Sequence, residues 1–160
     1  MSSIEKTGAG LSLEQLFPII EEKLSCGGEV TFKPHGISML PLLRQGKDSI
    51  TVGRLDKKPS RLDVIFYRRK NGQFVLHRIV GTDSDGYILC GDNQFAKEHG
   101  VTDDMIIGIM TAFYRDGKRV KTDNLHYLMY CRLLWARRIY LHAKSLVRRV
   151  CGKLKRMIKK

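Results

Sequence analysis

Residues 61–81 read RLDVIFYRRKNGQFVLHRIVG, and this stretch decides the fold class. Two strand-like runs, 61–69 and 73–81, flank the tripeptide Lys70-Asn71-Gly72. An Asn-Gly pair between runs of alternating apolar residues is the strongest short-range signal for a β-hairpin. The stretch therefore predicts two antiparallel strands joined by a tight turn.

Further short strands are predicted on both sides of this hairpin, each bounded by turn residues. They cover residues 29–33, 49–53, 87–90, 105–114 and 118–121. Residues 92–103 are predicted to form a loop. The body of the chain is thus expected to be mainly β, built from antiparallel strands.

Helical segments are predicted at both ends of this body. Residues 12–25 place apolar side chains at helical spacing, and glycines follow them. From Leu125 to Leu154 the apolar residues again keep a helical period, with Arg and Lys on the opposite side. We therefore predict three parts, a helical segment at 1–28, a β domain at 29–122 and a basic amphipathic helical tail at 123–160.

The net charge of +13 is concentrated in the tail. Residues 124–160 hold 11 Lys and Arg and no Asp or Glu, whereas the rest of the chain holds 18 basic against 16 acidic residues. Trp135 and Tyr140 add apolar mass beside these cations, so the tail is predicted to bind an anionic membrane surface. Two alternatives stay open. Nucleic acid is less favoured because no binding motif is present, and the charge can also be the solvated face of a packed helix.

Composition argues against a metal or another cofactor. Cysteines 26, 90, 131 and 151 and the five histidines show no metal-ligand spacing, and scattered cysteines of this kind are typical of reduced thiols. No secretory signal opens the chain. The longest uncharged apolar run, 105–114, is about half of the roughly 20 residues that a membrane span needs. We expect a cytoplasmic protein whose tail attaches it peripherally to a membrane.

A candidate nucleophile lies before the hairpin, in residues 36–41, which read GISMLP. Ser38 becomes a good nucleophile when a base within hydrogen-bond reach takes its proton. His77 is the candidate base, and it shares a strand face with Val75 and Ile79. Apolar neighbours keep an imidazole uncharged and able to accept that proton. Arg78 is expected to point to the opposite side.

An acid follows in the segment Gly91-Asp92-Asn93. Asp92 can either orient the imidazole of His77 or cap its own turn. Serine, histidine and acid in this order form a constellation with the mechanism of a serine peptidase.

These three motifs, G-x-S-M-x-P, H-R-I-V-G and G-D-N, resemble the signal peptidase I family, whose fold is shared with LexA-type self-cleaving repressors. Most bacterial members have a lysine as base. A histidine at position 77 is similar to the endoplasmic-reticulum-type and archaeal members. Those members carry a second acid several residues beyond their G-D-N, so the resemblance implies Glu98 as the alternative to Asp92, with Asp103 and Asp104 as its rivals. The resemblance covers roughly residues 30–115 and implies a LexA/signal peptidase-like β-fold, with Ser38 as nucleophile and oxyanion donor through its backbone N–H. It also implies an extended peptide substrate with small residues before the scissile bond.

We therefore expect a serine endopeptidase of signal peptidase type that cleaves a precursor or leader peptide through an acyl-enzyme on Ser38. Two alternatives remain. A LexA-like self-cleaving regulator fits less well, because that group uses lysine as base and about 30 residues before the body are too few for a DNA-binding domain. The other is an inactive peptide-binding or membrane-associated module. The chain also departs from the resembled family in lacking a predicted transmembrane anchor.

Overall fold

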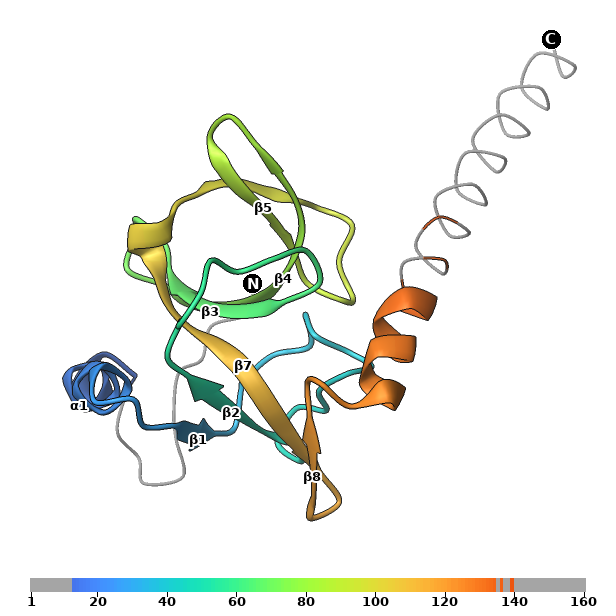
Figure 1. The fold of residues 1–160 in the computed structure, drawn as a ribbon, viewed down its shortest axis with the longest axis horizontal. Helices are drawn as coiled ribbons and strands as arrows, with labels where there is room; N and C mark the ends of the chain where they lie inside the picture. Colours follow the sequence, from blue (N-terminus) through green and yellow to red (C-terminus); the bar gives the residue numbers. More distant parts are fainter. Residues whose placement is uncertain (1–12, 135, 137–138, 140–160) are drawn as a thin grey trace, which may run out of the picture. The chain divides into compact units, whose positions relative to one another are not determined.

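The computed structural model describes residues 13–134, 136 and 139, and its body is a mainly antiparallel β-sheet preceded by one helix (Figure 1). The helix is α1 (Leu13–Ser25). The strands are β1 (Val30–Phe32), β2 (Ser49–Gly53), β3 (Val64–Arg68), β4 (Phe74–Asp83), β5 (Gly86–Cys90), β6 (Glu98–Val101), β7 (Ile106–Arg115) and β8 (Lys118–Lys121). A single 3-10 turn, Asp103–Met105, leads into β7. The prediction of a mainly β body is confirmed.

The strand order in the sheet is β1-β2-β7-β3-β4-β5-β6, and β8 also pairs with β7. The long strand β7 connects the two ends of the sheet, because its first half pairs with β3 and its second half with β2. Figure 1 shows β7 leaving the curved group of β3, β4 and β5 and running to β2 and β8. Strands far apart in sequence are thereby held in one sheet.

The predicted hairpin is formed by β3 and β4, which pair from Val64↔Arg78 to Arg68↔Phe74. In its turn Gly72 has φ +85°, a conformation that favours glycine. The side chain of Asn71 accepts a hydrogen bond of 3.1 Å from the backbone N–H of Gln73. The Asn-Gly pair therefore has the role that the sequence predicts for it.

The two faces of β4 pack against different groups of side chains. On one face Val75 and Ile79 belong to an apolar cluster with residues from β3, β5 and β6. On the other face the ring of Phe74 lies 5.8 Å from that of Phe66 and 5.1 Å from that of Phe17 in α1. Apolar burial on both faces explains why β4 reads as an almost continuous apolar run.

The prediction of a loop at 92–103 is wrong over its second half, where β6 pairs with β5 through Tyr87↔Val101 and Leu89↔Glu98. The physical reason is that only one apolar residue of β6, Val101, is buried. A strand of four residues that include a glycine and a glutamate shows no alternation of apolar and polar residues, so the sequence does not reveal it.

The chain divides into two compact units, Met1–Asn124 and Leu125–Lys160. Residues 125–134 of the second unit are helical. The remainder of the predicted amphipathic helix, including Trp135 and Tyr140, lies outside the described residues, and so do residues 1–12 of the predicted N-terminal segment. None of the helices within the described ranges is both long and apolar enough for a membrane crossing.

Candidate active site

Ser38 lies in a turn between β1 and β2, and only 4% of its surface is exposed. Gly36, just before it, has φ +101°, where a side chain would be strained. After it, the N–H of Leu43 donates to the carbonyl of Met39 at 3.0 Å and closes one helical turn. Met39 is itself buried beneath the turn. The glycine thus supplies the sharp entry to the turn, and the methionine anchors it in the core.

The G-D-N segment is in direct contact with this turn. The backbone N–H of Asn93 donates to the carbonyl of Ser38 at 2.7 Å, and the Asn93 side chain donates to the carbonyl of Ile37 at 3.2 Å. A Cβ at Gly91 would lie 2.7 Å from the Ser38 carbonyl oxygen, closer than real Cβ contacts allow. Glycine is therefore required at this position for the two segments to meet.

The serine turn also lies beside an edge of β4. The β4–β5 ladder begins at Arg78↔Cys90, so residues 74–77 precede the first β5 partner. Leu76 lines a small cavity together with Ser38. Ser38 also contacts Gly91, which directly follows the end of β5. Ser38 therefore lies at the point where β5 separates from β4. This places Ser38 beside Leu76, the residue next to His77.

Backbone groups of β4 face this same edge. The N–H of Arg69 donates to the carbonyl of Gln73 at 2.9 Å, so the main-chain groups of Gln73 are directed toward the strand that contains β3. In an antiparallel ladder this direction recurs at every second residue. The residues between, Phe74 and Leu76, therefore direct their N–H and C=O groups toward the edge beside Ser38.

His77 is almost completely buried, and its ring meets a tyrosine and a carboxylate. Its Nδ1 lies 3.4 Å from the Tyr67 hydroxyl and 4.0 Å from Glu98 Oε2. The Tyr67 hydroxyl donates its only proton to Glu98 at 2.7 Å, so toward His77 it can only accept. A neutral His77 therefore carries its proton on Nδ1 and its lone pair on Nε2.

The protonation states of Glu98 and Tyr67, the two groups beside the His77 ring, result from burial and hydrogen bonding. Burial alone raises the pKa of Glu98, but hydrogen bonds from Arg69 and Tyr67 outweigh it and the pKa falls below its usual value. Arg69 Nε donates to Glu98 Oε1 at 2.8 Å, and its NH2 group pairs with Oε2. The pKa of Tyr67 is raised by burial and by its bond to Glu98. Glu98 is thus ionised and Tyr67 protonated near neutral pH.

The two candidate acids lie in different surroundings in the structure. Both oxygens of Asp92 accept hydrogen bonds from Arg78, at 2.8 and 2.7 Å, and both side chains are buried. Arg78 also donates to the carbonyl of Leu62 at 2.7 Å. Adjacent strand residues point to opposite faces, so this ion pair lies on the side away from His77. Glu98 is the acid on the His77 side.

Sequence reasoning missed a second support of the serine turn. The NH2 group of Arg115, at the end of β7, donates to the carbonyls of Pro41 and Leu42 at 2.8 and 2.7 Å. Asp48, fully buried, accepts from Arg44 and from Arg115. Burial raises the pKa of Asp48, but the hydrogen bonds from Arg44 more than offset this and lower it. No local pattern in the sequence signals contacts between residues this far apart.

The cavity beside Ser38 is small. It offers a volume of ≈ 10 Å³, about the space of one water molecule. Its walls come from the serine turn, the segments flanking it and β4, namely Pro34, His35, Gly36, Met39, Leu43, Gln45 and Leu76. A cavity of this size leaves no room for a large side chain beside Ser38.

In the part of the chain that the structure describes, no group of three or more His, Cys, Asp or Glu is arranged to hold a metal ion. Cysteines 26, 90 and 131, which lie in the described part of the chain, form no disulfide there. Comparisons of the chain with family models, with curated proteins and with solved structures give no match.

Proposed function

We propose that the protein is a serine endopeptidase of signal peptidase type, with Ser38 as nucleophile and His77 as general base. One observation carries the proposal. The serine turn contacts the G-D-N turn and lies beside Leu76, which precedes His77 on β4, and Glu98 Oε2 lies 4.0 Å from His77 Nδ1. Ser38, His77 and Glu98 come from three separate segments of sequence, and the proposal requires the Ser38 hydroxyl to lie within hydrogen-bond reach of His77 Nε2.

The proposed reaction follows from these positions. Ser38 Oγ attacks the peptide carbonyl and its proton passes to His77 Nε2, while the Ser38 backbone N–H donates to the developing oxyanion. The imidazolium then protonates the leaving amine, and the peptide C–N bond breaks to give an acyl-enzyme. Water attacks the ester with His77 again as base, which releases the carboxylate product and regenerates Ser38. Tyr67 and Glu98 hold the ring and stabilise its charge.

The proposed substrate is an extended peptide that pairs with the edge of β4. Main-chain groups of Phe74 and Leu76 face that edge, and strand addition of this kind lets an enzyme hold a peptide backbone. The small cavity beside Ser38 favours a residue such as alanine or glycine next to the scissile bond. A precursor or leader peptide with small residues at its cleavage site fits both features.

We also propose that the protein is cytoplasmic and that its tail attaches it to an anionic membrane surface. In the described part of the tail, Leu125 and Leu133 are 69% and 65% exposed beside a strongly basic sequence. Co-sedimentation with anionic vesicles tests this, and removal of residues 125–160 is expected to abolish binding. Unchanged binding after the truncation would contradict the proposal.

The test of the enzymatic proposal is covalent labelling. A serine-reactive acylating probe is expected to label the wild type and not Ser38→Ala, because only an activated hydroxyl reacts at a useful rate. Ser84→Ala, which removes an exposed hydroxyl on the β4–β5 turn, is the matched control and should be labelled like the wild type. Equal labelling of Ser38→Ala and wild type would favour an inactive peptide-binding module.

A further inference from the structure

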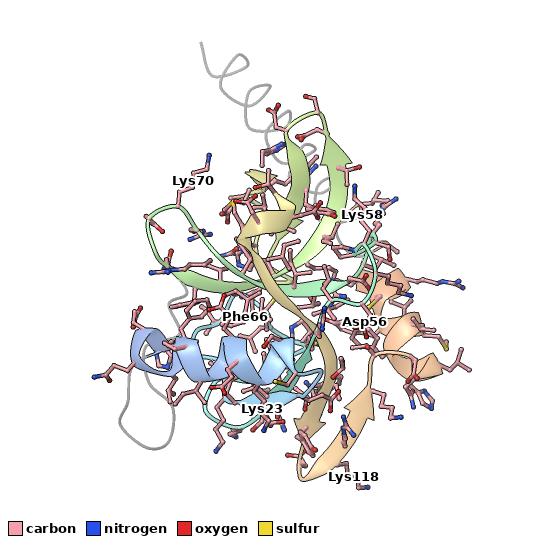
Figure 2. All side chains as sticks on the ribbon, turned by 60° about the vertical axis from the view of Figure 1, so that its left-hand side comes forward. Lys23, Asp56, Lys58, Phe66, Lys70 and Lys118 are labelled. Carbon is pink, nitrogen blue, oxygen red and sulfur yellow. The ribbon has the colours of Figure 1, made fainter. Side chains whose placement is uncertain are left out.

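A large groove lies apart from the cavity beside Ser38. It has a volume of ≈ 820 Å³ and is formed by α1, the β3–β4 turn and the segment that leads into β7. Figure 2 shows α1 with the turn that carries Lys70 above it. Apolar side chains, among them Phe17, Leu24 and Ile107, form part of the lining. The groove is large enough for several residues of a peptide.

The rim of the groove is predominantly basic. Four cations and two acids line it, namely Arg54, Arg68, Arg69 and Lys70 against Glu21 and Asp104. Arg68 is exposed, and its guanidinium lies over the rings of Phe17 and Phe74, at 5.6 and 5.3 Å from their centroids. Lys70 is exposed at the tip of the turn. A ligand in the groove therefore meets cations placed beside apolar surface.

The groove lies at the turn end of the β3–β4 hairpin, a few residues along β4 from the edge beside Ser38. Gly72, in the β3–β4 turn, lines the groove, and Phe74 and Leu76 follow it along β4. From Leu76 to Gly72 an extended chain covers about 13 Å at ~3.3 Å per residue. A peptide paired with this edge and positioned for attack by Ser38 thus reaches the turn end of the hairpin, where Gly72 lines the groove, after about four residues.

We propose that the groove binds an acidic segment of the peptide substrate, with apolar residues between the acids, about four to seven residues from the scissile bond. The inference rests on the proposed peptidase function for the cleavage itself. Carboxylates complement the exposed Arg68 and Lys70, and the apolar residues cover the lining around Phe17. Arg69 both lines the groove and binds Glu98, so a bound segment lies one side chain away from the acid behind His77.

Binding is measured on Ser38→Ala protein, which cannot form an acyl-enzyme. The probes are two fluorescein-labelled peptides of about 12 residues, long enough to cover edge and groove, one alternating Glu with Leu and the other Gln with Leu. Fluorescence anisotropy is expected to show the Glu peptide binding about tenfold more tightly, as two exposed charge contacts would give. Adding Arg68→Glu and Lys70→Glu should abolish this preference.

A matched charge reversal controls for the change in net charge. Lys57→Glu with Lys58→Glu alters exposed residues that do not line the groove, and the preference for the Glu peptide should persist. Lys70→Glu alone changes only an exposed turn residue, so it should fold even if the double variant does not. It should weaken the preference for the Glu peptide by about threefold. Equal affinity for both peptides, or an unchanged preference in the Arg68→Glu/Lys70→Glu protein, would overturn the proposal.

Cleavage of a peptide library by the otherwise wild-type protein separates this inference from the proposed function. Peptides that are cut should be enriched in Asp and Glu at the predicted distance from the cut, and the Arg68→Glu/Lys70→Glu variant should lose this enrichment while still cutting beside small residues. Cutting without acidic enrichment overturns the groove proposal alone. Absence of any cutting, with selective binding of the Glu peptide intact, overturns the peptidase and keeps the groove.

Discussion

The carbonyl oxygen of Ser38 accepts a hydrogen bond of 2.7 Å from the backbone N–H of Asn93. The turn that carries the candidate nucleophile is therefore held by the segment that follows β5, and not by its own neighbours alone. Two motifs that are separate in sequence form one backbone unit. The position of the serine hydroxyl depends on that unit.

Replacing Gly91 with alanine is expected to disable the site. Its Cβ would lie 2.7 Å from the Ser38 carbonyl oxygen and 3.0 Å from Ser38 Cβ, so the backbone of one segment must move. We expect the rate of Ser38 acylation to fall by at least about tenfold and the free energy of unfolding to fall by about 1–3 kcal/mol. Gly81→Ala is the control, because its Cβ meets no atom closer than 3.7 Å. If Gly91→Ala is acylated at the wild-type rate, the close packing of Gly91 against Ser38 is refuted.

Removing the Tyr67 hydroxyl is expected to slow the reaction without weakening substrate binding. Tyr67→Phe deletes the oxygen that accepts from His77 and donates to Glu98, so the ring loses its orientation. We expect kcat to fall on the order of tenfold with KM unchanged. Glu98→Gln should have a similar effect, and the double variant should be little worse than either, because the two side chains act on the same ring.

A purely structural role for Tyr67 predicts a different pattern. Tyr67→Phe would then lower the melting temperature and leave kcat of the folded protein as it is. The pH profile of kcat provides a second readout, since altered contacts at Nδ1 must change the protonation of His77. An unchanged pH profile in both variants would contradict the positioning role of Tyr67 and Glu98.

The ion pair between Arg78 and Asp92 is expected to support the fold. Removal of one partner leaves a buried charge, so Arg78→Met should lower the free energy of unfolding by about 3–5 kcal/mol. The double variant with Asp92→Leu should recover part of that loss, which denaturant titration measures. Asp92→Asn distinguishes a role in stability from a role in catalysis. If Asp92 only supports the fold, the folded fraction of this variant should be acylated within about tenfold of the wild-type rate. A loss of several orders of magnitude would make Asp92 the acid that orients His77.

The hairpin shows what the sequence predicts well. Asn71 and Gly72 specify a turn through their own side-chain and backbone preferences, and the strands on either side follow from local alternation. Strand β6 was missed because its four residues are recognised only through pairing with β5. Local residue preferences thus predict a hairpin correctly, but they do not predict a short strand that forms only by pairing with its neighbour.

The same distinction applies to the site. Ser38 and His77 could be selected from residue type, order and resemblance. Which of Asp92 and Glu98 lies near the His77 ring depends on the face that each side chain occupies, and that follows from the register of β4, β5 and β6. The contact from Arg115 to the turn after Ser38 joins residues on distant strands, for which a single sequence carries no signal.

Acidification is expected to destabilise the protein below about pH 4.5. The pKa of Glu98 is lowered in the folded state from its usual value of 4.5, and that of Asp48 is also lowered, so the unfolded chain binds more protons in this range. The stabilisation is present above the unfolded pKa and is lost as pH falls through the folded pKa. Thermal melts should show a shallower acid dependence for Glu98→Gln than for Glu22→Gln, which changes an exposed carboxyl on α1. Equal slopes would contradict the lowered pKa of Glu98.

The most direct measurement of the central claim is the rate at which a serine-reactive acylating probe modifies the protein, followed by mass spectrometry of the intact chain and its peptides. One adduct is expected, on Ser38, and its rate of formation should fall by roughly 10³-fold in His77→Ala. An adduct on another residue, or His77→Ala reacting as fast as the wild type, would contradict it.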